Sequence, residues 1–252
     1  MNTFFYGVLP YIALTIFVGG TIVRYTVFER GWTTKSSEFL AKKSLKWANP
    51  VFHLGLLMAF GGHFIGILVP KFVTEAAGTD EATYHMISLA GGIPAAVLFL
   101  GGFLWLMKRR FFGTSRMKVN TSSMDKLLYL VLLLTILSGT AGTLSNISAG
   151  FDYRESISPW FRSVLMLSPD VSLMKDVPAI FQFHMFMWMM TAILFPFTRL
   201  VHCLSLPFAY LLRSKIVSRR KGIFLQMTSE VQPGFAFRFS WCKPVHLACM
   251  MV

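Results

Sequence analysis

The stretch WANPVFHLGLLMAFGGHFIGILVP, residues Trp47–Pro70, decides the fold of this chain. It contains no Lys, Arg, Asp or Glu, and it is longer than the roughly 20 residues that a helix needs to cross a bilayer. Two histidines, His53 and His63, lie inside it. Because ionisable side chains are costly within a bilayer, the stretch predicts a membrane helix that carries a functional site.

Four more stretches without charged residues flank this one, and the composition of the whole chain agrees with them. The 252 residues are 54% hydrophobic and only 14% charged, against about 25% charged in soluble domains. We therefore predict an all-α integral membrane protein, a bundle of five transmembrane helices. The expected spans are about 4–23, 48–70, 83–107, 127–148 and 178–200. The first span lacks a preceding basic region, so we expect it to be retained and not cleaved as a signal peptide.

The basic residues predict the orientation of the bundle. Of the 24 Lys and Arg residues, 20 fall in loops 24–46 and 108–126 or from Arg199 onward. The positive-inside rule then places the N-terminus outside and the C-terminus in the cytoplasm. Such loops suit anionic lipids or an acidic protein face, so the net charge of +13 does not imply nucleic-acid binding. We expect a membrane domain over residues 1–221 and a cytoplasmic tail of unknown role over 222–252.

Four histidines lie in or beside two antiparallel spans. His63 precedes the next charged residue by eight positions, and His184 follows the last one by eight, so both lie ~12 Å from the outer boundary. That leaves His202 to face His53 nearer the cytoplasm. Two imidazoles from facing helices at one height are typical of a six-coordinate b-type haem. The sequence therefore predicts two haem b groups with these four residues as axial ligands.

The spacing within each span leaves alternatives open. Ten residues separate the histidines of the second span, and eighteen separate those of the fifth, so the levels match at one end only. Eighteen residues are close to five helical turns, which predicts one face for His184 and His202. Pro196 can kink or tilt this helix. Zinc binding, or a non-redox scaffold in which the histidines only pack, is the competing interpretation.

Small residues surround the histidines of the second span. At Gly55, Gly61, Gly62 and Gly66 the helix has no side chain, so a flat macrocycle can approach the backbone. The alternative is close packing of one helix on another. Arg199, one turn before His202, is expected to bind the cofactor by neutralising haem propionates. The alternative for Arg199 is snorkelling to the interface.

Several motifs resemble the cytochrome b (gamma) subunit of respiratory nitrate reductase. They are Phe52-His53-x-Gly55, Gly62-His63-Phe64-x-Gly66, Ala90-Gly-Gly92, Leu106-Met-Lys-Arg-Arg-Phe-Phe112, Gln182-Phe-His184 and the run from Leu194 to His202. The similarity extends in register from the first span to about Arg219. The resemblance implies a five-helix subunit of the bacterial inner membrane that carries two b haems. His63 and His184 would ligate the outer haem, and His53 and His202 the inner one.

The resemblance also implies the reaction. Quinol would be oxidised at the periplasmic side, and electrons would pass to an iron–sulfur (beta) subunit and then to a molybdenum (alpha) subunit that reduces nitrate. No catalytic residue for nitrate is therefore expected in this chain. The alternative is the same subunit type in a sulfite-reduction or heterodisulfide-reductase-like complex.

The expected quinol site includes Gly62, His63 and His85. The family commonly has a basic residue at the outer start of the third helix, where this chain has Thr83-Tyr84-His85. His85 or Tyr84 is then the expected hydrogen-bond partner or proton acceptor, His85 because histidine titrates near physiological pH. The alternative is an aromatic-belt role for Tyr84 and His85.

Overall fold

The computed structural model describes residues 3–27, 42–113, 121–148 and 150–204. The chain divides into two compact units, Met1–His202 and Cys203–Val252. The second is described only at its first two residues, so the predicted tail 222–252 lies outside the described residues.

The described residues form helices and no strands. The long helices are α1 (Leu9–Thr26), α2 (Lys42–His63), α4 (Glu81–Phe112), α6 (Ser123–Ser145) and α8 (Ala179–Leu194), and the shorter ones α3 (Lys71–Ala76) and α7 (Ile157–Leu165). Two π-helices, η1 (Phe4–Val8) and η4 (Phe64–Leu68), adjoin α1 and α2, and three 3₁₀-helices are η5 (Val171–Met174), η6 (Phe195–Phe197) and η7 (Arg199–Leu204).

Five helical segments are long and apolar enough to cross a membrane, which confirms the predicted five-span architecture. They are Phe4–Thr26, Leu45–Leu68, Glu81–Phe112, Ser123–Ser145 and Ala179–Phe197. The third is longer than the charge-free run predicted, because its helix continues through Arg109 and Arg110 to Phe112. Charged residues at a span end extend a helix into the interface without breaking it.

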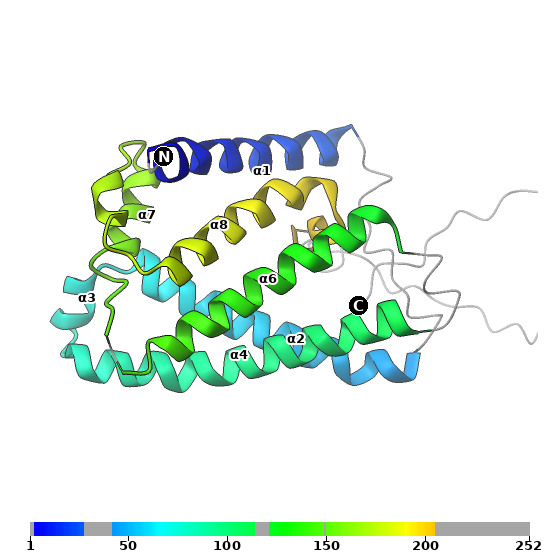
Figure 1. Cartoon of the computed structure of the whole chain (residues 1–252), viewed down its shortest axis with the longest axis horizontal. Helices are drawn as coiled ribbons and strands as arrows, with labels where there is room; N and C mark the ends of the chain where they lie inside the picture. The colour runs from blue at the N-terminus through cyan, green and yellow to red at the C-terminus, as the bar shows by residue number, and fades with distance from the viewer. Residues whose placement is uncertain (1–2, 28–41, 114–120, 149, 205–252) are drawn as a thin grey trace, which may run out of the picture. The chain divides into compact units, whose positions relative to one another are not determined.

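Successive long helices run in opposite directions (Figure 1). Helix α2 packs on α4, α4 on α6, α6 on α8, and α8 on α1. One end of the bundle contains α3, α7 and the first turn of α4, and we call it the Lys71 end. At the other end α4 finishes and α6 begins, and we call it the Asp125 end. The histidine-bearing helix α2 finishes at the Lys71 end, where α8 starts.

Glycines bring the backbones of α2 and α4 into contact. A Cβ at Gly55 would lie 2.3 Å from the amide nitrogen of Phe99, and a Cβ at Gly102 would lie 2.6 Å from the Cα of Phe52. Helices in a membrane approach this closely where small residues occupy the interface. Gly55 therefore serves helix packing, and the expectation that it gives room to a macrocycle is wrong.

Buried aromatic and apolar residues form the core of the Lys71 end. Trp160 of α7 is 1% exposed, its ring lies edge-on to Tyr6, and its indole Nε1–H donates to the Tyr6 carbonyl at 3.0 Å. Ser158 donates to the Gly66 carbonyl at 2.8 Å, and Arg162 donates to the Ile67 carbonyl at 2.8 Å. These bonds satisfy carbonyls that a helix end leaves without partners. Helix α7 thereby fixes the end of the segment that begins at His63.

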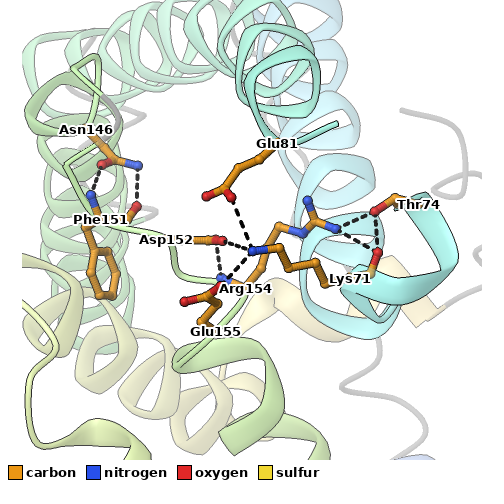
Figure 2. A network of polar contacts seen from close by, with 8 residues as sticks. All are labelled: Lys71, Thr74, Glu81, Asn146, Phe151, Asp152, Arg154 and Glu155. Atoms are coloured by element: carbon orange, nitrogen blue, oxygen red, sulfur yellow. Dashed lines mark hydrogen bonds and ion pairs between the residues drawn. The ribbon is translucent and has the colours of Figure 1, made fainter. Parts of the chain in front are cut away.

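An ion cluster ties together three segments at this end (Figure 2). The Lys71 ammonium lies 2.6 Å from Glu155, 3.2 Å from Asp152 and 3.4 Å from Glu81. The Glu155 carboxylate, with smaller contributions from Asp152 and Glu81, raises the pKa of Lys71 above its ordinary value although burial opposes the change. The cluster joins α3, the start of α4 and the loop before α7.

Arg154 adds a second link between the same segments. It is 5% exposed, its guanidinium lies 3.8 Å from the centre of the Tyr84 ring, and it donates to the Thr74 hydroxyl. The Tyr84 hydroxyl lies 3.4 Å from that of Tyr153. Burial raises the pKa of Tyr153, and the hydrogen bond with the Tyr84 hydroxyl raises it further. Tyr84, which is half-buried, therefore contacts both Arg154 and Tyr153 at this end of the bundle.

The fifth span ends in a break and not in a continuous helix. Helix α8 stops at Leu194, Pro196 lies in η6, and Thr198 is extended with φ −117° and ψ −177° before η7 starts. Proline lacks the amide hydrogen that an α-helix needs and clashes with the preceding turn. His202 consequently stands on a separate 3₁₀ segment, and the expectation of one helical face for His184 and His202 is wrong.

Candidate functional site

His63 and His184 come together near the Lys71 end. Their ring centroids lie 5.9 Å apart and the ring planes are inclined by 39°. A metal ion bonds an imidazole nitrogen at about 2 Å, so this separation suits two rings that share one ion. Trp188, one turn after His184, places its ring 6.2 Å from that of His63. The helices α2 and α8 thus bring to one level the two histidines that depth alone had paired.

Hydrogen bonds from α6 fix the tautomer of His184. Its Nδ1 lies 3.0 Å from the Thr135 carbonyl and 3.0 Å from the Ser138 hydroxyl. A carbonyl only accepts, so Nδ1 carries the hydrogen and Nε2 retains its lone pair. This Nε2 is buried and has no hydrogen-bond partner. A buried polar atom without a partner is unusual and points to a ligand.

His63 has the same arrangement. Its Nδ1–H donates to the Ala59 carbonyl one turn back, at 2.7 Å, which leaves the Nε2 lone pair available. A Cβ at Gly61 or Gly62 would meet nothing within 4 Å, whereas one at Gly66 would lie 2.8 Å from the Tyr153 hydroxyl. Gly61 and Gly62 therefore keep the backbone beside His63 open. Tyr153 occupies the space at Gly66, so the expectation of a macrocycle there is wrong.

His53 and His202 repeat the pattern nearer the Asp125 end. His53 Nδ1–H donates to the Asn49 carbonyl at 2.9 Å, and His202 Nδ1–H donates to the Arg199 carbonyl at 2.5 Å. Burial lowers the pKa of His202, and His53 is near enough that its charge lowers that pKa further. The pairing of His53 with His202 stays a prediction.

The four imidazoles thus have the same chemistry. Each gives Nδ1–H to a backbone carbonyl and keeps Nε2 as the basic nitrogen, which is the arrangement that metal-ligating histidines adopt. Grouping in pairs suits a haem, whose iron accepts one imidazole on each side. Within the ranges that the structure covers, no three His, Cys, Asp or Glu residues gather as a metal site. A tetrahedral zinc site needs more ligands than either pair provides.

Helix α6 contributes residues that the sequence analysis missed. A Cβ at Gly139 would lie 2.7 Å from the Cε1 atom of His184, so only glycine leaves room for this imidazole. Ser138 beside it provides the hydroxyl contact. The run Ser138-Gly139-Thr140-Ala141-Gly142 is visible as a cluster of small residues, but small residues alone do not show which partner they accommodate.

A buried ion cluster lies at the Asp125 end. Arg199 contacts the Asp125 carboxylate with two nitrogens, Nε to Oδ1 at 2.9 Å and Nη2 to Oδ2 at 2.5 Å. Arg110 of α4 adds a third contact, Nη2 to Oδ2 at 3.3 Å. The three side chains are only 4 to 15% exposed. Arg199 is therefore paired inside the protein, an arrangement that neither sequence interpretation of this residue included.

His85 is the fifth residue of α4, at the Lys71 end. Its Nε2–H donates to the Ile147 carbonyl at 3.3 Å, where α6 has just ended. Because that carbonyl is an acceptor, the Nδ1 atom of His85 keeps a lone pair. The hydrogen bond links α4 to the end of α6, and it does not link His85 to His63.

Comparison with known proteins identifies the family of the chain. A sequence model described as nitrate reductase gamma subunit matches residues 2–221. The nitrate reductase gamma chain of Bacillus subtilis is 46% identical over 218 residues, covering 86% of this chain and 97% of the relative. Respiratory nitrate reductase 1 gamma chain of Escherichia coli is 34% identical, covering 84% and 95%. A nitrate reductase-like protein of Mycobacterium tuberculosis is 38% identical over 88% of this chain but only 34% of its own length. The chain therefore belongs to the nitrate reductase gamma subunit family and is a multi-pass bacterial membrane subunit of an enzyme complex whose partner subunits reduce nitrate.

Proposed function

We propose that this chain is the diheme cytochrome b subunit of a respiratory nitrate reductase and that it oxidises quinol. His63 and His184 hold one haem near the Lys71 end, and His53 and His202 hold the other toward the Asp125 end. The observation that carries the proposal is the common arrangement of the four imidazoles, each with Nδ1–H given to a backbone carbonyl and Nε2 left basic.

The residues of this chain set the conditions for electron transfer. Each haem, when bound, supplies one-electron chemistry at its iron. The fixed tautomers orient the imidazoles and leave Nε2 of each as the basic nitrogen. Arg199 lies one turn before His202. Its guanidinium has a second proposed role, the binding of haem propionates, in addition to the contact with Asp125. Electrons leave the Asp125 end for an iron–sulfur (beta) subunit and then a molybdenum (alpha) subunit.

Quinol oxidation releases two electrons and two protons, so the site needs a proton acceptor beside the outer pair. Gly62 and His63 provide the open face of α2. His85 is the proposed proton acceptor because its Nδ1 lone pair stays available while its Nε2–H donates to the Ile147 carbonyl. The Lys71 end then faces the periplasm with the N-terminus, and the protons are released there.

The proposed orientation rests on the distribution of charge. Of the 24 basic residues, 20 fall in loops 24–46 and 108–126 or from Arg199 onward, the segments that the positive-inside rule assigns to the cytoplasm. An impermeant thiol reagent applied to intact cells tests it. In a background with all three native cysteines changed to Ser, Glu75→Cys should be labelled and Lys126→Cys should not. Labelling of the second variant alone would reverse the orientation.

The proposed extent of the membrane cytochrome is residues 1–221. The family match over residues 2–221 supports this extent. We propose that residues 222–252 form a separate cytoplasmic tail. Removal of residues 222–252 should leave the haem content per polypeptide unchanged, and loss of a haem would contradict the division.

The decisive test is a reduced-minus-oxidised optical spectrum of the purified chain in detergent, with haem measured as the pyridine haemochrome. We expect two b haems per polypeptide, reducible by a quinol analogue. A protein made with ample haem that nevertheless contains none would refute the proposal. Haem that is reduced by dithionite but not by the quinol analogue would refute only the quinol step.

A further inference from the structure

Helix α6 contains no histidine. It nevertheless contacts α8, which carries His184, and η7, which carries His202. We propose that α6 positions a ligand of each haem, with Asp125 acting on His202 through Arg199 and Ser138 acting on His184. The inference rests on the proposed diheme function and assigns positioning roles to residues that are not themselves ligands.

The chain does not continue as an α-helix after α8. His202 lies on η7, a 3₁₀-helix of six residues that follows Pro196 and an extended Thr198. Short 3₁₀ segments have poorer hydrogen-bond geometry than α-helices. The direction of the His202 side chain is therefore not set by continuity with α8. Contacts made by η7 itself must provide it.

Segment η7 contacts α6 through Arg199. Arg199, the first residue of η7, makes a two-point contact with the Asp125 carboxylate at 2.9 and 2.5 Å. A planar guanidinium bound at two points has a fixed orientation. The carbonyl of the same residue accepts the Nδ1–H of His202 at 2.5 Å. One residue therefore joins the carboxylate on α6 to the imidazole.

Asp125 is itself held in place by further contacts. The Asp125 carboxylate accepts the amide of Ser122 at 3.0 Å, and the Ser122 hydroxyl accepts the amide of Asp125 at 3.2 Å, a capping box that fixes the first turn of α6. Arg110 holds the carboxylate from α4. Two guanidinium groups and one carboxylate are buried together, so removal of the carboxylate leaves like charges facing one another, which is strongly destabilising locally.

The same helix acts on the other haem through different atoms. Ser138 gives its hydroxyl hydrogen to the Thr135 carbonyl at 3.0 Å, and its oxygen lies 3.0 Å from His184 Nδ1. The imidazole Nδ1–H is therefore shared between the Thr135 carbonyl and the Ser138 oxygen. Asp125 and Ser138 lie nearly four turns apart on α6, so each can be changed while the other is left intact.

The two positions permit a crossed experiment on the full-length chain with its partners. Asp125→Asn keeps an oxygen for the amide of Ser122 but removes the charge that orients Arg199. We expect it to change the low-spin ferric EPR signal of the haem held by His53 and His202, and to weaken retention of that haem roughly 10- to 100-fold. The other haem should keep its signal. Ser138→Ala should give the reverse pattern.

Controls separate positioning from general damage. Lys126→Gln removes an exposed neighbouring charge and should leave both EPR signals unchanged. Asp125→Glu, which restores the carboxylate, should recover part of the wild-type signal. Arg199→Lys keeps the charge but not the two-point contact, and it should shift the same signal as Asp125→Asn. This variant provides the test if Asp125→Asn does not accumulate.

The outcomes are distinct. His53→Ala and His63→Ala first assign each EPR signal to its haem. Wild-type signals in both Asp125→Asn and Arg199→Lys would overturn the proposal, and so would equal changes at both haems. A wild-type chain that lacks two haems would overturn the proposed function itself, which is visible before any variant is measured.

Discussion

The imidazoles of His63 and His184 lie with their ring centroids 5.9 Å apart, although they belong to the second and fifth membrane spans. Because both rings give Nδ1–H to a backbone carbonyl, both have their basic nitrogen free for the same purpose. The pair therefore defines a level in the bundle at which a single metal ion can join two helices that are distant in sequence.

Removal of one imidazole from this level should remove one haem. We expect His63→Ala and His184→Ala each to reduce the haem content from two to about one per polypeptide and to abolish reduction by a quinol analogue. His53→Ala and His202→Ala should spare the outer haem and block onward transfer. The pyridine haemochrome and redox difference spectra measure this. Retention of both haem signals in His53→Ala membranes would contradict the pairing.

Gly139 should be required for the same haem although it is not a ligand. In Gly139→Ala the new Cβ would lie 2.7 Å from His184 Cε1, closer than van der Waals contact permits, so the ring must move. We expect loss or altered EPR of the outer haem and no change at the inner one. Gly92→Ala is the matched control, since its Cβ meets Thr143 at an ordinary 3.7 Å. Equal behaviour of the two variants would show that the ring adapts without consequence.

Substitution by alanine should lower the stability of the protein at Gly55 but not at Gly101. A Cβ at Gly55 would lie 2.3 Å from the backbone of Phe99, whereas one at Gly101 meets nothing within 4 Å. Overpacking costs about 1 to 3 kcal/mol, and alanine in an open helical position gains up to about 1 kcal/mol. The melting temperature in detergent should fall in Gly55→Ala and stay or rise in Gly101→Ala. A stable Gly55→Ala would mean that α2 and α4 separate easily.

The Lys71 cluster should stabilise the protein up to alkaline pH. We expect Lys71→Met to cost about 1 kcal/mol, because partly exposed ion pairs contribute little individually. The raised pKa of Lys71 means that its contribution is complete below its ordinary value of 10.5 and disappears only as the pH rises through the higher folded value. The difference in melting temperature from wild type should therefore stay constant from pH 7 to about 10 and close above that.

A matched lysine tests whether this effect belongs to the cluster. Lys175 is exposed at the same end and makes no ion pair within the described ranges. Lys175→Met should leave the melting temperature unchanged across the same pH range. If both variants lose the same stability, the carboxylates around Lys71 contribute nothing specific.

The five spans could be predicted because each is a run of apolar residues between charges, a property of neighbouring positions. The levels of His63 and His184 followed from the rise per residue in such a run. The contacts of the glycines could not be predicted in this way. Gly55 and Gly61 lie in the same charge-free run, each two positions from a histidine, yet one touches the α4 backbone and the other faces open space. Only the placement of a second helix distinguishes them.

The partner of Arg199 could not be predicted for a similar reason. Asp125 stands 74 positions away in the sequence. Its local signal, Ser122-Ser-Met-Asp125, indicates a helix cap, which is present, but nothing in a cap predicts a guanidinium from another segment. A helix break at Pro196 could be predicted, since proline disfavours helix interiors. How far the chain departs from the path of α8 depends on the contacts of η7.

The break at Pro196 also affects how the distance between the two proposed haem sites can change during evolution. In an unbroken helix one inserted residue turns every later side chain by about 100°, so a ligand could not change depth without also changing direction. Here residues 195–201 pass through a 3₁₀ turn, an extended residue and a second 3₁₀ turn. Insertions or deletions in this connection can lengthen or shorten the electron-tunnelling distance between the proposed haems while His184 keeps its place on α8.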